Sequence, residues 1–412
     1  MKFLKFYKSS VVLLGCVILG GIVGIVLGPK AIILQPFGNL FLNLMFMVIV
    51  PLVFFSISSA IANMKSMNRL GKIMASVFFV FLCTSVVIAV IGFIGALIVN
   101  PTRGIDTATI QSILTKAGDA PKLEQVTPLQ QLVNTFTVSD FVDLFSKKNM
   151  LQIIVFAVLF GVSTVMVGQK AKPVVILLDA ATSVIVKIVD IIMYYAPIGL
   201  FCYFASVIGQ LGGQIVGGYL RVFILYIVIA IVYYFGFFTL YAFVSGGRTK
   251  VKIFWKNAIK PSVAALATCS SAACIPINLE YTQKMGVPKD ISETVIPLGA
   301  NMHKDGSVLG GVMKITFLFG IFGRSITSPS AIMSIIFISI LVGAVMAAIP
   351  SGGMIGEMLI LSIYGFPPSL LPVIAVISTI IDAPATLLNS TGNTVTAMMI
   401  TRLVEGKSKL RA

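Results

Sequence analysis

The stretch GANMHKDGSVLGG, residues 299–311, places three ionisable residues side by side within a run of small and apolar residues. His303 is the only histidine of the chain, and Lys304 and Asp305 follow it directly. An ionisable side chain inside a membrane is expensive, so such residues face a protein interior or a water-filled cavity and mark functional sites. The stretch therefore predicts a polar site embedded in a membrane region.

The composition around this stretch is typical of a membrane protein. The chain has 412 residues, of which 58% are hydrophobic and 11% are charged, and its mean hydropathy is +1.03. Soluble domains carry about 25% charged residues. Runs of roughly 20 apolar residues, enough to cross a bilayer core of about 30 Å, recur along the chain. Spans are expected near 10–28, 38–62, 73–99, 150–168, 174–209 and 216–245. The sequence therefore predicts an all-α polytopic membrane protein, with the run at 174–209 tilted or broken at Pro197.

The distribution of positive charge predicts the orientation. The formal net charge is +16, and Lys and Arg gather in alternate short loops, as at Lys65, Arg69 and Lys72. This positive-inside pattern predicts a multi-pass protein of the bacterial inner (plasma) membrane with both termini in the cytoplasm. Basic residues confined to loops argue against a nucleic-acid partner. The five cysteines lack metal-ligand spacing, so we expect no metal, cofactor or disulfide framework.

Four interruptions mark the apolar runs of the second half. They are TCSSAACIP (268–276), NMHKDGS (301–307), AAIPSGG (347–353) and DAPATLLNSTGNT (382–394). The four interruptions form two consecutive pairs. In each pair, a turn that contains a proline precedes a broken helix that contains an aspartate. Pro276 precedes Asp305 and Pro350 precedes Asp382, at near-equal separations. Paired broken segments point to the substrate site of a secondary transporter, where freed backbone groups bind ions and carboxylates. Two ordinary kinked hairpins are the alternative explanation.

The motifs in this order resemble the dicarboxylate/amino acid:cation symporter family, which includes the archaeal and mammalian glutamate transporters. The resemblance spans nearly the whole chain. It rests on LFLNLMFMVIVPLVFFSISSAI (40–61), YYAPIGLF (194–201), TCSSAACIP, VPKDISETVIPLGANMHKDG (287–306) and IIDAPATLLNSTGNTVTAM (380–398). Each motif is weak alone, whereas their order and spacing together are specific.

The resemblance implies an architecture of eight transmembrane helices and two re-entrant hairpins, assembled as a homotrimer in membrane lipid. A scaffold and a mobile transport domain would move against each other as an elevator. The implied division is scaffold helices 1–2 in residues 1–72, transport helix 3 in 73–100, a polar loop and scaffold helices 4–5 in 101–212, and the remaining transport elements in 213–412. The hairpins would cover 251–289 and 332–369, with tips at Ser270–Ser271 and Pro350–Gly353.

The cation sites of the family look altered in this chain. The usual seventh-helix pattern, Asn-Met-Asp-Gly-Thr, is replaced over residues 303–307, where His303 and Lys304 precede the retained Asp305. The resemblance also implies that the Asn and Asp of that pattern bind sodium together with a Tyr and a Thr-Ser pair in the third helix, and that the last helix offers a second sodium-binding Asp. Here the pair is kept, but the other two positions differ; the four residues are Phe81, Thr84, Ser85 and Asn393.

These changes remove oxygen ligands and add basic groups, which predicts transport without sodium. We expect Lys304 to act as a tethered cation that pairs with Asp305, because an unpaired intramembrane carboxylate is expensive. His303, with an ordinary pKa of about 6.5, is a candidate proton carrier. Uncoupled facilitation is an alternative, and so is a Lys304 that extends to water beside a hydrogen-bonded core His303.

The substrate positions implied by the resemblance are partly retained. Asp382 would hold an α-amino group and Asn389 an α-carboxylate, and the remaining positions are Ser270, Ser271, Pro350, Ser351, Gly352 and Thr386. Acidic-amino-acid members use an arginine where this chain has Ala385, and some use one at Cys269. Because a guanidinium fork is hard to replace, a small neutral amino acid such as serine, threonine or alanine is the expected substrate.

Two other functions stay open. A proton symporter for an aspartate- or glutamate-like dicarboxylate is one alternative, if Lys304 faces the substrate. A transport-inactive relative that acts as a sensor or an anion channel is another. A membrane enzyme is disfavoured, because the sequence contains no Cys–His pair, metal cluster or nucleophile elbow.

Overall fold

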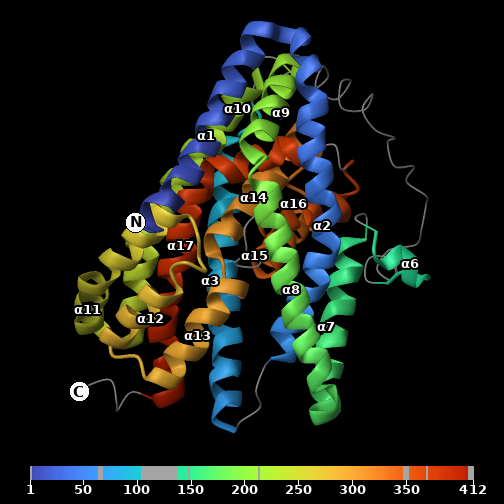
Figure 1. Ribbon diagram of the computed structural model, residues 1–412. Coiled ribbons are helices and arrows are strands. Elements are labelled where there is room, and N and C mark those ends of the chain that lie inside the picture. Colours follow the sequence, from blue (N-terminus) through green and yellow to red (C-terminus); the bar gives the residue numbers. More distant parts are fainter. Residues whose placement is uncertain are drawn as a thin grey trace.

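The computed structural model describes residues 2–63, 68–103, 137–146, 149–211, 214–346, 352–367 and 370–406. Every regular element within these ranges is a helix (Figure 1). Four helical stretches of the described chain are long and apolar enough to cross a membrane: Gly15–Ser59, Lys72–Val99, Ile215–Thr268 and Val373–Glu405. The structure therefore agrees with a multi-pass helical membrane protein.

The first half consists mainly of long helices joined by short turns. They are α1 (Lys2–Leu27), the 3₁₀ turn η1 (Gly28–Leu34), α2 (Gln35–Ala62), α3 (Asn68–Val99), the short α6 (Phe141–Leu144), α7 (Met150–Val167), the 3₁₀ turn η2 (Gly168–Ala171), α8 (Lys172–Met193) and α9 (Ala196–Leu211). The predicted break near Pro197 is confirmed, because α8 and α9 are separate helices and Pro197 lies in the first turn of α9. A proline is tolerated there because that N–H has no helical partner. Most of the polar stretch 101–148 lies outside the described residues.

The second half contains more and shorter helices. They are α10 (Gln214–Val232), the π-helical turn η3 (Tyr233–Phe237), α11 (Phe238–Thr268), α12 (Ile275–Lys284), α13 (Lys289–Met302), α14 (Asp305–Ile321), α15 (Pro329–Val345), α16 (Gly352–Tyr364) and α17 (Leu371–Glu405). Gly246 and Gly247 have non-helical backbone angles, so α11 is two arms joined at a kink. Its second arm and α12 occupy the expected first hairpin, and α15 and α16 occupy the second.

One predicted break is wrong. The sequence suggested a broken helix at 382–394, but α17 is a continuous helix of 35 residues that runs through Pro384. Proline is tolerated inside a membrane helix where neighbouring helices satisfy the carbonyl group that it frees. Helix α17 is packed on several sides by α11, α14, α13, α10 and α3, which provides such surroundings. The breaks predicted at 268–276 and 301–307 are present, whereas 347–351 lies outside the described residues.

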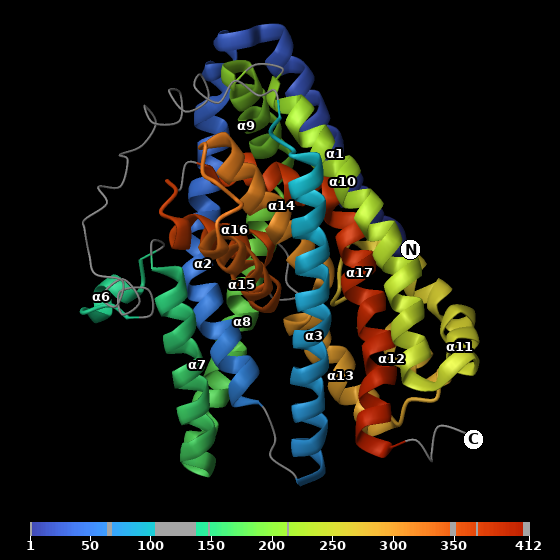
Figure 2. The same ribbon diagram turned by 180° about the vertical axis from the view of Figure 1, so that it is seen from behind.

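The helices form two packing groups, which are clear in both views (Figures 1 and 2). In one group α2 packs on α7, α8 and α9, and α1 packs on α9. In the other, α17 is central and contacts α11, α13 and α14, while α3 packs on α14 and α15. The groups meet where α16 contacts α2 and α7 and where α1 touches α11 and α17. The ionisable stretch of α13–α14 lies inside the second group.

Candidate functional site

The site is built at the break between α13 and α14. Helix α13 ends at Met302, His303 has extended backbone angles, and Lys304 is non-helical with φ −136° and ψ 75° before α14 begins at Asp305. The break leaves polar backbone groups that a membrane interior cannot satisfy, so it requires protein partners. Part of that need is met locally, because the His303 N–H donates to the Gly299 carbonyl at 3.0 Å. A Cβ at Gly306 would overlap the backbone of Ala385, so glycine allows α14 to approach α17 closely.

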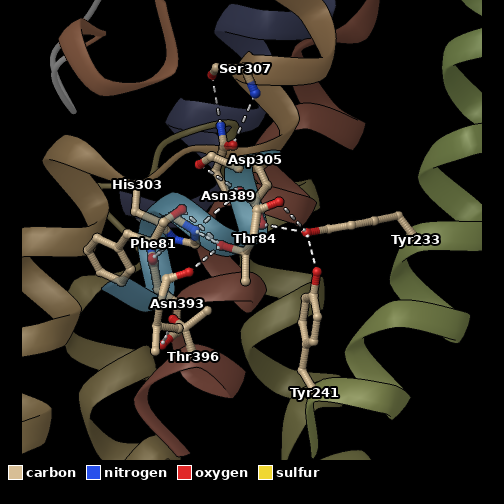
Figure 3. Close-up of polar contacts among 12 residues, drawn as sticks. Phe81, Thr84, Tyr233, Tyr241, His303, Asp305, Ser307, Asn389, Asn393 and Thr396 are labelled. Atoms are coloured by element: carbon tan, nitrogen blue, oxygen red, sulfur yellow. Dashed lines mark hydrogen bonds and ion pairs between the residues drawn. The ribbon is translucent and has the colours of Figure 1, made fainter. Parts of the chain in front are cut away.

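His303 lies at the centre of a cluster that joins three helices (Figure 3). Its Nε2 lies 2.7 Å from Thr84 Oγ1 of α3 and 3.1 Å from Asp305 Oδ1, and its Nδ1 lies 2.8 Å from Asn393 Oδ1 of α17. The ring stacks on Phe81 with centroids 4.1 Å apart. The side chain is only 1% exposed. The imidazole therefore occupies the space between the polar groups that the sequence predicted to form a cation site.

The hydrogen-bond pattern fits an imidazole that is protonated on both nitrogens. The amide oxygen of Asn393 is an acceptor, so Nδ1 of His303 donates to it. The Thr84 hydroxyl lies 3.1 Å from the Val80 carbonyl and 3.2 Å from the Phe81 carbonyl, and when it donates to either of them its oxygen accepts from Nε2 of His303. The other group facing Nε2 is the Asp305 carboxylate. Every neighbour of the ring nitrogens is then an acceptor, and a cationic imidazolium satisfies all of them.

Asp305 receives further donors from α3 and from the helix pair around η3. Its Oδ1 lies 3.3 Å from the Ser85 hydroxyl, and its Oδ2 accepts from the Tyr233 hydroxyl at 2.8 Å. Tyr241 lies 3.1 Å from the same tyrosine oxygen. Tyr233 begins the π-helical turn η3, an irregularity that is frequent at functional sites. Sequence reasoning missed both tyrosines, although the tyrosines that recur along this apolar span were the available signal.

Lys304 does not form the ion pair with Asp305 that the sequence led us to expect. The ion pair that the structure gives Asp305 is with His303, not with Lys304. Lys304 is buried and interacts electrostatically with Asp382 of α17. Successive side chains of an extended backbone point to opposite sides, which explains why neighbouring residues of the break serve different carboxylates. The imidazole takes the place predicted for the ammonium group.

The expected substrate residues of α17 lie beside the start of α14. Asn389 accepts a hydrogen bond from the Ser307 N–H at 3.2 Å, and its amide group donates to the Ser307 hydroxyl at 3.2 Å. Thr386 is buried one turn earlier. Asp382 lies one further turn away and is the electrostatic partner of Lys304. The structure thus brings together Asp382, Lys304 and Asn389 at the contact of α14 and α17.

The two expected hairpin tips are described to different extents. Ser270 and Ser271 lie in the turn between α11 and α12, where the Ser270 hydroxyl accepts a backbone N–H three residues later at 3.2 Å. Helix α12 is fixed to α17 by Asn278, whose amide donates to the Ser390 hydroxyl at 2.8 Å. Of the second tip, Gly352 begins α16, whereas Pro350 and Ser351 lie outside the described residues.

A second charged cluster lies further along the same helices. Lys314 of α14 and Glu357 of α16 form an ion pair at 3.2 Å, with both side chains almost fully buried. Ser378 of α17 donates to the same carboxylate oxygen. Lys314 also interacts electrostatically with Asp382. Sequence reasoning missed this pair, although each member is a lone charge within an apolar run.

The two clusters carry nearly balanced charge. The buried lysines Lys304 and Lys314 and the buried carboxylates of Asp305 and Glu357 sum to zero, and the exposed Asp382 adds one negative charge that a protonated His303 balances. Such balance matters because burying a net charge is costly. Among the described residues, no group of three or more His, Cys, Asp or Glu side chains is arranged to hold a metal ion.

Comparison with known proteins identifies the family of this chain. The model of the sodium:dicarboxylate symporter family matches residues 10–403. The chain belongs to the sodium:dicarboxylate symporter family. The family is one of transporters, so the buried cluster lies in a protein of a class that moves solutes across membranes.

Several named relatives align over most of their length. The chain is 27% identical to the proton/sodium-glutamate symport protein of Bacillus caldotenax over 94% of this chain and 93% of the relative. It is 23% identical to the proton/glutamate-aspartate symporter of Bacillus subtilis, with 93% and 92% covered. It is 27% identical to the C4-dicarboxylate transport protein of the same species, with 85% and 83% covered.

Proposed function

We propose that this protein is a secondary transporter that carries a small dicarboxylate or acidic amino acid together with protons and without bound sodium. The observation that carries this proposal is the position of His303, whose ring contacts Thr84, Asn393 and Asp305 at 2.7–3.1 Å. A dissolved cation placed about 4 Å from a fixed positive charge is repelled by about 4 kcal/mol at an effective dielectric of 20, which is about a thousandfold in affinity. The imidazole therefore replaces the ion.

Charge balance supports the coupling to protons. When the exposed Asp382 is counted with the buried groups, the two clusters are neutral with His303 protonated. A doubly negative substrate would leave this region with two uncompensated charges, and burying them is unfavourable. Protons that enter with the substrate remove the imbalance, and an imidazole that loses its proton in the substrate-free carrier can take one up again when the substrate binds.

The neighbourhood of Lys304 supports an acidic substrate. Lys304 interacts with Asp382, the residue that would otherwise receive a substrate amino group. An incoming carboxylate gains a partner in the ammonium group, whereas an incoming amino group has to compete with it. The names of the relatives, which specify glutamate, aspartate or C4-dicarboxylates, favour the same class.

A small neutral amino acid is the second candidate. Ala385 and Cys269 stand where family members with acidic substrates carry an arginine, so the substrate side chain has no guanidinium partner at either position. This candidate requires the Lys304 ammonium group to serve Asp382 alone, without contacting the substrate.

The movement and assembly form part of the same proposal. The two packing groups, one built on α2 and the other on α17, support a scaffold and a transport domain that slide past each other. Residues 1–72 and 101–212 would belong to the scaffold, and 73–100 and 213–412 to the transport domain. A homotrimer with cytoplasmic termini follows from the family resemblance and the charge pattern.

Uptake into liposomes tests the proposal. The purified protein is reconstituted, and labelled succinate, aspartate, glutamate, serine and alanine are each offered under an inward proton gradient or an inward sodium gradient. We expect accumulation of the acidic compounds under the proton gradient, with no response to sodium. Uptake that requires sodium would refute the coupling, uptake of serine and alanine alone would select the second candidate, and binding without accumulation or exchange would indicate a transport-inactive relative.

A further inference from the structure

A groove lies at the kink of α11, and none of its lining residues belongs to the His303 cluster. It has a volume of about 520 Å³ and is lined by Gly236, Thr239, Leu240, Phe243, Arg248, Val251 and Lys252. The turn at Gly246 and Gly247 folds the second arm of α11 back, so residues from both arms form the walls. Gly236 contributes no side chain, which leaves the space open. The groove is of a size that accommodates part of a small organic molecule.

One wall of the groove is apolar and exposed. Leu240 and Phe243 are each 50% exposed, and the neighbouring Phe235 is 59% exposed. In a chain of a membrane-transporter family, the hydrocarbon of a lipid is the apolar material that such a surface meets.

The other wall carries two cations. Arg248 and Lys252 are four residues apart, so their side chains lie on the same face of the helix. Both are exposed, and neither makes a hydrogen bond or ion pair with any residue that the structure describes. A third cation is close by, because Arg402 of α17 donates to the Val244 carbonyl at the kink. This concentration of positive charge has an oxyanion as its natural partner, and a guanidinium binds phosphate through two parallel hydrogen bonds.

The kink lies at a suitable depth for a lipid headgroup. The helical run from Gln214 to the kink contains roughly 30 residues and is therefore about 45 Å long, whereas the hydrocarbon core of a bilayer is about 30 Å thick. The cations at the end of this run consequently reach the headgroup level, while Leu240 and Gly236 lie about two and three turns deeper along the same helical run.

We propose that this groove binds an anionic phospholipid. Its headgroup phosphate lies between Arg248 and Lys252, and one acyl chain follows Leu240 and Phe243. A zwitterionic lipid fits less well, because its ammonium group would lie among cations and the residues that line the groove include no carboxylate. Basic pockets between membrane helices recognise anionic headgroups in this way. The apolar wall distinguishes the site from a simple phosphate site.

The only tryptophan of the chain reports on this groove. Trp255 donates from Nε1 to the Thr239 hydroxyl at 2.9 Å, and its ring stacks on Phe235 with centroids 5.5 Å apart. Thr239 itself lines the groove. Bromine atoms on a bound acyl chain would therefore quench the fluorescence of Trp255.

The experiment compares two brominated lipids at the same small fraction in phosphatidylcholine vesicles that contain the full chain. Brominated phosphatidylglycerol is expected to quench Trp255 more strongly than brominated phosphatidylcholine. Each basic residue contributes about fivefold in affinity for anionic lipid, so Arg248→Gln with Lys252→Gln should remove a preference of roughly 25-fold. The matched control, Lys170→Gln with Lys172→Gln, removes the same charge from exposed positions at η2 and the start of α8 and should keep the preference. An unchanged emission maximum in unbrominated vesicles verifies that each variant is folded.

Three results would overturn the proposal. Equal quenching by the two lipids in the unmodified protein would show that the headgroup is not recognised. Loss of the preference in the control pair as well would show a general effect of surface charge. A change in Trp255 fluorescence on addition of inorganic phosphate, together with no quenching by brominated phosphatidylglycerol, would indicate a site for free phosphate instead of a lipid.

Discussion

Replacement of His303 by asparagine tests whether the imidazole balances a buried carboxylate. In His303→Asn, Asp305 keeps the hydroxyl groups of Ser85 and Tyr233 but loses its charged partner. Two unit charges separated by 3.1 Å attract by about 5 kcal/mol at an effective dielectric of 20. Removal of one partner of a buried ion pair costs about 3–5 kcal/mol. For a chain of this length, that loss corresponds to a fall in melting temperature of roughly 3–6 °C.

The assay is the decay of the monodisperse size-exclusion peak after heating in detergent. The matched control is His303→Asn combined with Asp305→Asn, which removes both charges and is expected to recover more than half of the lost stability. A double variant that melts no higher than His303→Asn alone would refute the ion-pair argument, as would a single variant that melts with the parent. Sodium chloride should stabilise His303→Asn more than choline chloride does, but only partly, because Phe81 and Asn393 still replace oxygen ligands.

Three further perturbations address the neighbouring groups. Glu357→Gln removes the carboxylate that forms the ion pair with the buried Lys314 ammonium group, so we expect the free energy of unfolding to fall by about 3–5 kcal/mol in the same thermal assay. The added change Lys314→Met should largely restore this stability. Tyr233→Phe deletes one hydrogen bond to an ionised carboxylate and should cost about 1.5–3 kcal/mol; an unchanged melting temperature would contradict that bond. Lys304→Met frees Asp382 for a substrate amino group, so competition assays should show at least a tenfold shift from succinate towards aspartate, and an unaltered ratio would place Lys304 away from the substrate.

The helical architecture could be predicted because hydropathy directly reflects the constraint that a bilayer imposes. Apolar runs gave the positions of the long helices, and small-residue interruptions gave the breaks at 268–276 and 301–307. The continuity of α17 could not be predicted in the same way. Pro384 reads as a break in isolation, and only the helices packed around α17 reveal that its surroundings tolerate a proline.

The membership of the site was predicted better than its pairing. Thr84, Ser85, Asp305 and Asn393 meet around His303 as a group of polar residues from three helices. Sequence spacing alone does not say which of two adjacent basic residues faces which carboxylate, because that depends on the backbone angles of the break. Partners that come from distant segments, such as Tyr233 for Asp305, are equally invisible before the chain is folded.

The covalent attachment of the imidazole has a consequence for the setting in which this carrier works. A dissolved ion fills its binding site according to its concentration in the medium. The imidazole belongs to the chain itself, at the break before α14, so its occupancy of the site does not depend on the salt concentration of the medium. Only its proton answers to the surroundings, and under the proposed coupling the carrier would respond to the acidity of the medium and not to its salinity.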